Sequence, residues 1–290
     1  MASESRIGLL AGWGRYPLVV AEALRRQGRE IYGLGIKDHV DPQLRDLCTG
    51  YREIGLARLG AAIRFLRRHH VRQATMAGKV HKVLLFQPRS WIRHLPPDWT
   101  CIKTFYPHFV SKTKDRTDDS MLGAVVDAYA RGGVTFAPAT DFAPELLVKQ
   151  GIIAGGKLSR SESLDIAFGW RLAKEMGRLD VGQSVAVKGQ AVIAVEAIEG
   201  TDLCIQRAGE LCRTGGFTLV KVAKPQQDMR FDVPTIGAGT LQSLAAAGGR
   251  VLAVEADKTI VIDQDEVAQL AKRHRITVVA IHDEAAREAA

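Results

Sequence analysis

The sequence predicts an α/β protein of two domains. Its first half alternates apolar, strand-like segments with helix-like ones, and this alternation is typical of a parallel sheet wrapped by helices. The second half is dominated by short strand-like segments, so the pattern changes along the chain. The length of 290 residues is more than one typical domain needs and less than three need, which also favours two packed units.

Strands and helices are expected in regular succession through the first half. The expected strands are residues 7–10, 30–36, 73–77 and 134–137, and the expected helices are 17–27, 59–69 and 118–130. The segment PATDFAPE then carries Pro138 and Pro144, which interrupt regular structure. We therefore place the domain boundary here, with one domain at 1–138 and another at 139–290.

The second half is expected to begin with a long helix, because apolar residues recur at helical spacing through 163–176. Further helices are expected at 202–212 and 265–274, and strands at 183–187, 191–195, 217–222, 250–255, 259–262 and 276–281. This mixture indicates an α/β domain but does not define its topology.

The composition is that of a soluble globular protein, with 46% hydrophobic and 25% charged residues. The formal net charge of +8 suits an anionic partner. That partner could be nucleic acid, a phosphorylated substrate or an anionic membrane face, and charge alone does not choose among them.

The cytoplasm is the expected compartment. The amino terminus lacks the long apolar core of a signal peptide, and no apolar segment approaches the roughly 20 residues of a spanning helix. The four cysteines show neither a C-x-x-C pair nor a histidine at zinc spacing, which favours reduced, buried thiols over a metal site.

The opening segment IGLLAGWGRYP predicts a strand, a glycine-rich loop and a helix. Gly12, Trp13 and Gly14 form the loop, and Pro17 is placed to start the helix. Glycines let the backbone approach a ligand, and the amides at a helix start bind anions such as phosphate. Pro17 stands where a dinucleotide fingerprint would have its third glycine, so NAD is not expected. The alternative is a tight turn that simply needs glycine.

A second loop is expected to reach the same edge of the sheet. Gly78 and Lys79 follow the strand predicted to end at residue 77, and ligands bind outside the carboxyl ends of such strands. Lys79 could therefore meet a phosphate, although it could equally be a solvated lysine.

The segment DRTDD places five polar residues immediately before an apolar helix. Thr117 or Asp118 would be a good N-cap, and carboxylates there also favour the helix dipole. Capping explains one or two of these residues, so Asp118 and Asp119 are also candidates for a substrate or metal contact.

Charged residues of both signs gather in two loops of the second half. The loop VEAIEGTD contains Glu196, Glu199, Thr201 and Asp202, and the segment KVAKPQQDMRFDVPTIG contains Lys221, Lys224, Asp228, Arg230, Asp232 and Thr235. Splitting a phosphoanhydride needs carboxylates for a divalent cation, cations that offset phosphate charge, and a positioned water. Magnesium is the expected metal, because the loops offer hard oxygen ligands. Taken singly, each residue could be only a cap, a turn or a solvated edge.

Four segments, LLAGWGRYP, DRTDD, VEAIEGTD and KPQQDMRFDVPTIG, occur in this order and resemble the LpxI family of UDP-2,3-diacylglucosamine pyrophosphatases. The resemblance covers nearly the whole chain, and the last two segments are the specific ones. It implies a Rossmann-like first domain, a second α/β domain and a substrate chamber between them. It also implies a magnesium-dependent, cytoplasmic and peripheral enzyme of lipid A biosynthesis, which hydrolyses UDP-2,3-diacylglucosamine to UMP and 2,3-diacylglucosamine 1-phosphate at the inner face of the membrane.

The resemblance also implies roles for particular residues. Asp232 matches the essential aspartate of the family motif, and we expect it to bind magnesium or to orient the attacking water. Lys224 and Arg230 are expected to neutralise the diphosphate, with Asp228 beside them in the catalytic group. The further metal candidates are Asp202, Glu196 and Glu199. The candidate substrate-binding residues are Gly12, Trp13, Gly14, Gly78, Lys79, Asp118, Asp119, Thr201 and Thr235.

Alternatives stay open for the partner and for the surface. The aromatic and basic strip 81–99 could rest on an anionic membrane or form an ordinary loop, and the apolar clusters 83–86 and 91–92 could line a lipid entrance or belong to the core. A hydrolase or transferase acting on a soluble nucleotide sugar would need no acyl chamber. A basic nucleic-acid-binding protein would leave VEAIEGTD unexplained, so we expect no nucleic acid. We expect a homodimer.

Overall fold

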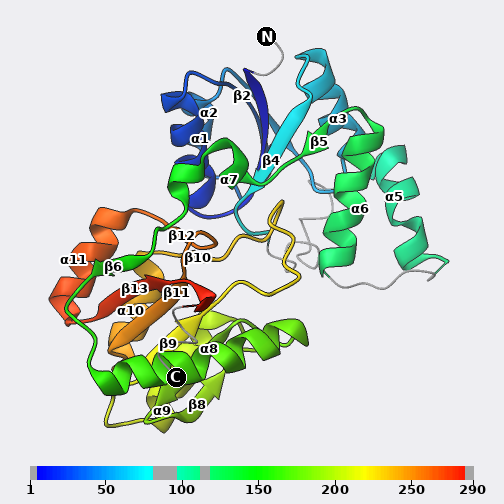
Figure 1. Cartoon of the computed structure of the whole chain (residues 1–290). Coiled ribbons are helices and arrows are strands. Elements are labelled where there is room, and N and C mark those ends of the chain that lie inside the picture. The colour runs from blue at the N-terminus through cyan, green and yellow to red at the C-terminus, as the bar shows by residue number, and fades with distance from the viewer. Residues whose placement is uncertain (1–4, 81–96, 112–117, 285–290) are drawn as a thin grey trace. The chain divides into compact units, whose positions relative to one another are not determined.

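The structure is a computed structural model that describes residues 5–80, 97–111 and 118–284 (Figure 1). It divides into two compact units. Unit 1 comprises Met1–Pro144 together with Asp228–Phe231, and unit 2 comprises Glu145–Gln227 and Asp232–Ala290. The division at Pro144 falls in the segment that carries the two prolines of the predicted boundary.

Unit 1 is built on a five-stranded, wholly parallel sheet in the order β3-β2-β1-β4-β5. The strands are β1 (Arg6–Ala11), β2 (Glu30–Ile36), β3 (Gly50–Ile54), β4 (Gln73–Ala77) and β5 (Thr135–Phe136). The helices are α1 (Tyr16–Arg26), α2 (Leu44–Leu47), α3 (Leu59–Arg68), α5 (Trp99–Phe109), α6 (Asp118–Arg131) and α7 (Ala139–Phe142). The Rossmann-like, parallel first domain is thus confirmed.

Side-chain alternation along the central strand explains why helices cover both faces of this sheet. In β1, Ile7 and Leu9 are fully buried, whereas a side chain at the intervening Gly8 would meet Leu66 of α3 at 3.1 Å. Helices α3 and α6 pack in one hydrophobic cluster with β2, β4 and β5, and α1 packs against β1, β2 and β4 (Figure 1). Buried on both faces, β1 and β2 are nearly continuous apolar runs after their first residues.

Unit 2 contains a six-stranded mixed sheet in the order β6-β13-β11-β9-β7-β8 and a two-stranded parallel ladder, β10-β12. The strands are β6 (Gly151–Ala154), β7 (Ser184–Lys188), β8 (Ala191–Val195), β9 (Thr218–Lys221), β10 (Thr235–Ile236), β11 (Val251–Glu255), β12 (Ile260–Val261) and β13 (Thr277–Ile281). The helices are η2 (Pro144–Leu146), which spans the division, and α8 (Arg160–Arg178), α9 (Thr201–Leu211), α10 (Ala238–Ala246) and α11 (Gln264–His274).

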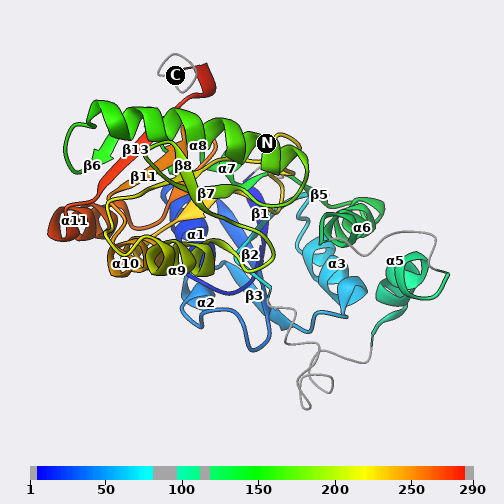
Figure 2. The ribbon, with the colours of Figure 1, turned by 90° about the horizontal axis from the view of Figure 1, so that it is seen from below.

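Two hydrophobic clusters occupy the two faces of this sheet. Val251 and Ala253 of β11 pack with α8, whereas Leu252 and Val254 of the same strand pack with α9, α10 and α11. Figure 2 shows α8 on one side of the sheet and the other three helices on the opposite side. The α/β second domain is therefore confirmed, with a mixed sheet as its topology.

The four cysteines are free thiols, as predicted. Cys101 and Cys204 are buried, whereas Cys48 and Cys212 are only half-buried, which corrects the expectation that all are buried. Burial raises the pKa of Cys48 and Cys101 to about 11 and that of Cys204 to about 12, so these three thiols are protonated at neutral pH. In the described part of the chain, no helix is both long and apolar enough to cross a membrane.

Candidate active site

The glycine loop of unit 1 is held by backbone bonds to the loop after β4. The amide of Trp13 donates to the carbonyl of Lys79 at 2.8 Å, and the amide of Lys79 donates back to Trp13 at 2.9 Å. A Cβ at Gly12 would lie 2.5 Å from the Lys79 carbonyl oxygen, and Gly78 has a φ of +90°. The close approach of two loops therefore requires both glycines, whether or not a ligand binds.

Gly14 and the exposed side chains of this loop are the parts open to a ligand. Gly14 has a φ of +102° and open space where its side chain would be. Trp13 is 51% exposed, Lys79 is exposed, and α1 begins after Arg15 without a side-chain cap in the described residues. The loop thus offers an indole face, an ammonium group and helix-start amides at the carboxyl ends of β1 and β4.

Asp118 and Asp119 are the first two residues of α6, and their side chains lie outside the described residues. The rest of DRTDD, residues 115–117, and positions 81–96 of the aromatic and basic strip lie outside them too. The predictions made for these residues stay predictions.

Asp228 and Arg230 form a two-bonded ion pair within unit 1. The Arg230 Nε donates to Asp228 Oδ1 at 2.9 Å, and its Nη2 donates to Oδ2 at 2.5 Å. Hydrogen bonds from Arg230 lower the pKa of Asp228, and the same bonds raise the pKa of Arg230. Both oxygens of Asp228 are therefore engaged, which favours a role in orienting the Arg230 guanidinium over a role as a base. Phe231 packs against the core of unit 1.

The loop that carries Asp232 is closed by Gln227. Its Nε2 donates to Asp232 Oδ2 at 2.6 Å, and its Oε1 accepts from the Lys224 amide at 2.9 Å. The Lys224 ammonium donates to Asp180 Oδ1 at 2.6 Å. Oδ1 of Asp232 accepts no hydrogen bond from the described residues, so one carboxylate oxygen of Asp232 is held and the other stands open.

A buried polar cluster joins three of the predicted residues through Lys221. The Lys221 ammonium donates to Thr201 Oγ1 and to the carbonyl of Thr235, both at 3.2 Å. Thr201 in turn donates to Glu196 Oε1 at 2.9 Å. Lys221 and Glu196 are each only 7% exposed, so a cation and a carboxylate share one hydroxyl bridge in the interior of unit 2.

Glu196 has one carboxylate oxygen without a partner. Its Oε2 is buried and makes no hydrogen bond within the described residues. Glu196 follows β8, Lys221 ends β9 and Thr201 begins α9, so the cluster forms where these elements meet. An unpaired carboxylate oxygen in such a place is costly unless a cation or water satisfies it.

The other two predicted metal ligands, Glu199 and Asp202, do not join this cluster. Glu199 accepts from the Ala197 amide at 3.1 Å and pairs with Arg207; its own amide, Arg207 and the Ala197 amide hold its pKa below the usual range. Asp202 is exposed in the first turn of α9. Among the residues that the structure describes, no three acidic, histidine or cysteine side chains converge as metal ligands would.

Two buried charged residues, Lys221 and Glu255, were not identified by the sequence analysis. Lys221 was noted there but assigned no role, and Glu255 was treated only as the end of a strand. Glu255 is 2% exposed and pairs with Lys174 at 2.6 Å and Lys258 at 2.9 Å, while its Oε2 accepts from the Ala223 amide at 2.8 Å. Each ends an otherwise apolar strand, and a charge in that place is the signal that could have identified them.

Lys221→Met is expected to lower the free energy of unfolding by about 2 kcal/mol, because it removes two hydrogen bonds and leaves the Glu196 carboxylate buried. Lys221→Met combined with Glu196→Gln should recover about half of that loss, since no charge is then left unpaired. Urea unfolding measures both. Lys149→Met, which breaks an exposed pair with Asp257, is the control and should change stability by less than about 0.5 kcal/mol. A double variant no more stable than Lys221→Met would mean that the two charges are not coupled.

The fold and these sites define a two-unit α/β protein whose polar groups gather at the ends of its strands, as they do in enzymes that bind anionic ligands. The family model for the LpxI N-terminal domain matches residues 6–146, and that for the LpxI C-terminal domain matches residues 149–279. The chain therefore belongs to the LpxI family. A Caulobacter vibrioides relative, named UDP-2,3-diacylglucosamine pyrophosphatase LpxI, is 30% identical over 271 residues, which is 90% of this chain and 92% of the relative.

Proposed function

We propose that this protein hydrolyses the pyrophosphate bond of UDP-2,3-diacylglucosamine, releasing UMP and 2,3-diacylglucosamine 1-phosphate for lipid A biosynthesis. The observation that carries the proposal is the likeness to the Caulobacter vibrioides pyrophosphatase, which spans nine-tenths of both chains. Family models that match both units support it.

Asp232 is the proposed catalytic carboxylate. Gln227 fixes one of its oxygens, and the other faces no donor among the described residues. A carboxylate held in one orientation can align an attacking water or take part in binding a cation. Phosphoryl transfer is mainly positioning and charge stabilisation, so no protein nucleophile is required.

Cationic side chains would offset the charge of the diphosphate. Arg230 is oriented by Asp228 through bonds to its Nε and Nη2, and Lys224 is paired with Asp180. Ion pairs of this kind hold a cation in place before substrate arrives, and charge-assisted bonds to phosphate are the strong ones. The exposed Trp13 and Lys79 of the glycine loop are the proposed contacts for the nucleotide part.

Magnesium is part of the proposal in a limited form. The described carboxylates do not converge as a cage of protein ligands, but magnesium usually takes one or two carboxylates and completes its shell with substrate phosphates and water. The open oxygen of Asp232 and the unpaired Oε2 of Glu196 suit that mode, so we assign these two residues as the candidate ligands. When bound, the ion would neutralise charge that develops on the diphosphate.

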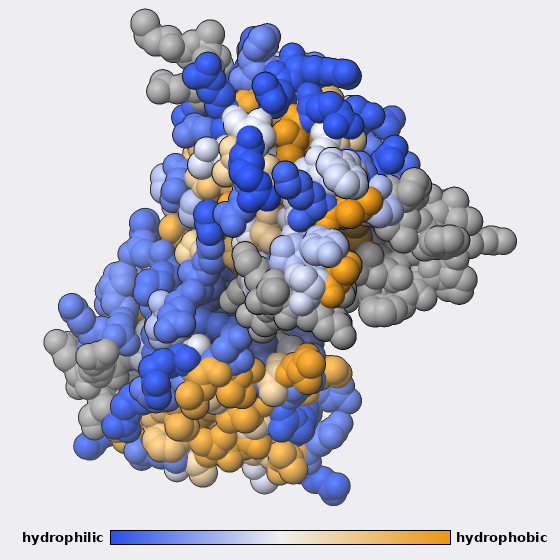
Figure 3. Space-filling view, turned by 90° about the vertical axis from the view of Figure 1, so that its right-hand side faces the viewer, coloured by the Kyte–Doolittle hydropathy of each residue, from blue (hydrophilic) through white to orange (hydrophobic). Residues whose placement is uncertain are grey.

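We also propose that the protein works at the inner face of the cytoplasmic membrane and forms a homodimer. The net charge of +8 suits an anionic lipid surface. Figure 3 shows apolar side chains gathered on the visible face of unit 2. The aliphatic residues exposed on this unit include Ile198, Leu211 and Leu179, and exposed apolar patches mark interaction sites.

Purified protein incubated with UDP-2,3-diacylglucosamine and magnesium should release UMP, and a chelator should reduce the rate. UMP is measured by chromatography, with UDP-N-acetylglucosamine as the soluble comparison. Turnover of the acylated substrate alone supports the proposal. Turnover of the soluble sugar alone would show instead an enzyme of soluble nucleotide sugars. UMP release that a chelator does not reduce would exclude a role for magnesium.

A further inference from the structure

Unit 1 contains a basic pocket that the proposed function does not use. The pocket has a volume of about 650 Å³, and its basic lining consists of Arg6, Arg67, His70, Arg72 and Arg131. Arg6 is the first residue of β1 and Arg72 immediately precedes β4, so the pocket lies at the amino ends of these parallel strands. The glycine loop follows the carboxyl end of β1, so it lies at the opposite end of these parallel strands.

The pocket carries positive charge without a matching negative charge. Among the residues that the structure describes, no acidic side chain lines it, and Arg6 is the one of its four arginines with an ion pair, to Glu30 at 2.9 Å. Within the described residues, Arg67, Arg72 and Arg131 make no ion pair or side-chain hydrogen bond. Like charges that line one pocket repel one another, and a bound anion would offset that repulsion.

Helix ends explain only part of this arrangement. Arg67 and Arg131 lie in the last turns of α3 and α6, where a cation complements the helix dipole. Arg72 lies between α3 and β4, so no helix end accounts for its charge. His70 has a φ of 56°, the left-handed conformation that closes α3, because the Val71 amide donates to the Leu66 carbonyl and the His70 amide to the Arg67 carbonyl, each at 3.0 Å.

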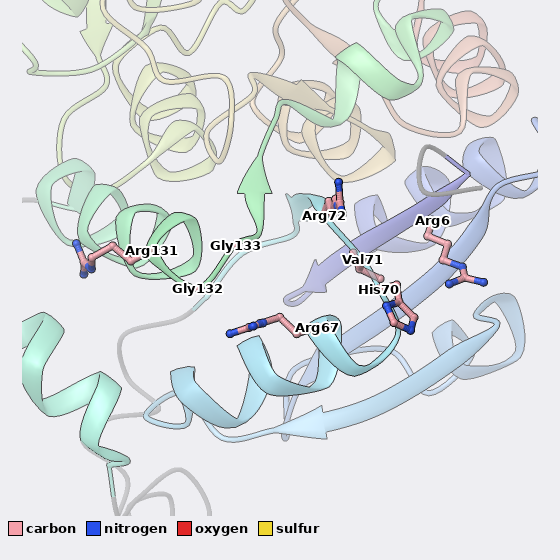
Figure 4. Close-up of a pocket in the computed structure, with 8 residues that line it drawn as sticks. All are labelled: Arg6, Arg67, His70, Val71, Arg72, Arg131, Gly132 and Gly133. Atoms are coloured by element: carbon pink, nitrogen blue, oxygen red, sulfur yellow. The ribbon is translucent and has the colours of Figure 1, made fainter. Parts of the chain in front are cut away.

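We propose that this basic pocket binds the phosphate groups of an extended polyanion. Figure 4 shows that the basic side chains come from separate elements and stand apart around the turn at Gly132 and Gly133, without converging on one point. Guanidinium groups pair well with phosphate, and separated groups suit a ligand with several phosphates. The phosphates could belong to a soluble polyphosphate or to lipid headgroups.

Chemical footprinting tests the pocket by residue. The full-length protein is treated with phenylglyoxal, which modifies accessible arginines, and the modified peptides are quantified by mass spectrometry. Inorganic tripolyphosphate should protect Arg67, Arg72 and Arg131 while leaving Arg26 and Arg52 reactive. A second arm replaces tripolyphosphate with vesicles of phosphatidylglycerol or phosphatidylcholine. Protection by tripolyphosphate assigns a soluble ligand, protection by phosphatidylglycerol vesicles alone assigns headgroups, and protection by neither overturns the proposal.

Matched variants test whether the effect is local. Arg67→Gln, Arg72→Gln and Arg131→Gln together should weaken binding of the protecting ligand by at least about tenfold, because three charge-assisted contacts are lost. Arg26→Gln, Arg52→Gln and Arg58→Gln together remove the same charge from exposed positions of the same unit and should change affinity by less than about twofold. Equal weakening in both variants would overturn the proposal, since general charge would then explain binding. Unchanged UMP release by the pocket variant separates this result from that of the proposed active site.

Discussion

Asp232→Asn is expected to lower the rate of UMP release by about three orders of magnitude while changing the free energy of unfolding by less than about 1 kcal/mol. The amide oxygen of asparagine can still accept the Gln227 hydrogen bond, so the loop should keep its conformation. The negative charge that would hold a cation or polarise a water is lost. Single-turnover assays and urea unfolding measure the two effects on the same preparations.

A neighbouring carboxylate gives the control for this variant. Asp257 also belongs to unit 2, is exposed, and has a φ of 56°, a conformation that asparagine tolerates. Asp257→Asn should therefore keep at least about half of the wild-type rate. Retention of more than about a tenth of the wild-type rate by Asp232→Asn would show that this carboxylate is not central to the chemistry.

Elements with strong apolar patterns were predicted closely. The bounds of β2, β4 and β8 agree with the predicted strands residue for residue, and α8, predicted at 163–176, begins three residues earlier. The capping box of Ser159 and Glu162 explains that earlier start, because it satisfies amides of the first turn.

Elements without such patterns were missed. The edge strand β3 carries Arg52 and Glu53 on its exposed positions, so it lacks an apolar run. Helix α5 was not predicted; it begins after Asp98, which caps it through the Cys101 amide, and it contains Pro107, a residue that is uncommon inside helices. Strand β6 pairs antiparallel with β13 at the edge of the unit 2 sheet, and α10 is rich in small residues; neither was expected.

The sequence indicated which residues belong to the polar cluster better than it indicated which of them are in contact. Glu196, Thr201 and Thr235 do lie together, but the residue that joins them is Lys221, whose role depends on strand register that the sequence did not define. Glu199 is predicted with Glu196 as a metal ligand, which stays a prediction; the structure pairs Glu199 with Arg207, in the second half of α9. Pairings of this kind follow from tertiary packing, and spacing in sequence does not reveal them.

Glu255→Gln is expected to cost about 3 kcal/mol of unfolding free energy, the largest stability effect that we predict. Glu255 is 2% exposed and Lys174, whose side chain is 19% exposed, lies 2.6 Å from it. Removing one charge leaves the other in the interior without compensation. The same carboxylate accepts the Ala223 amide, and Lys174 also donates to the Ala223 carbonyl, so the pair fixes the backbone just before Lys224.

The exposed pair between Glu175 and Arg178 on α8 provides the matched comparison. Both side chains are more than half exposed, so Glu175→Gln should change the free energy of unfolding, measured with urea, by less than about 0.5 kcal/mol. Combining Lys174→Met with Glu255→Leu should recover part of the loss, because apolar groups can replace a buried pair, although the Ala223 amide then lacks its acceptor. If Glu255→Gln lowered the free energy of unfolding no more than Glu175→Gln, burial of the Glu255–Lys174 pair would not contribute to stability. The start of the Asp232 loop would then depend on other contacts.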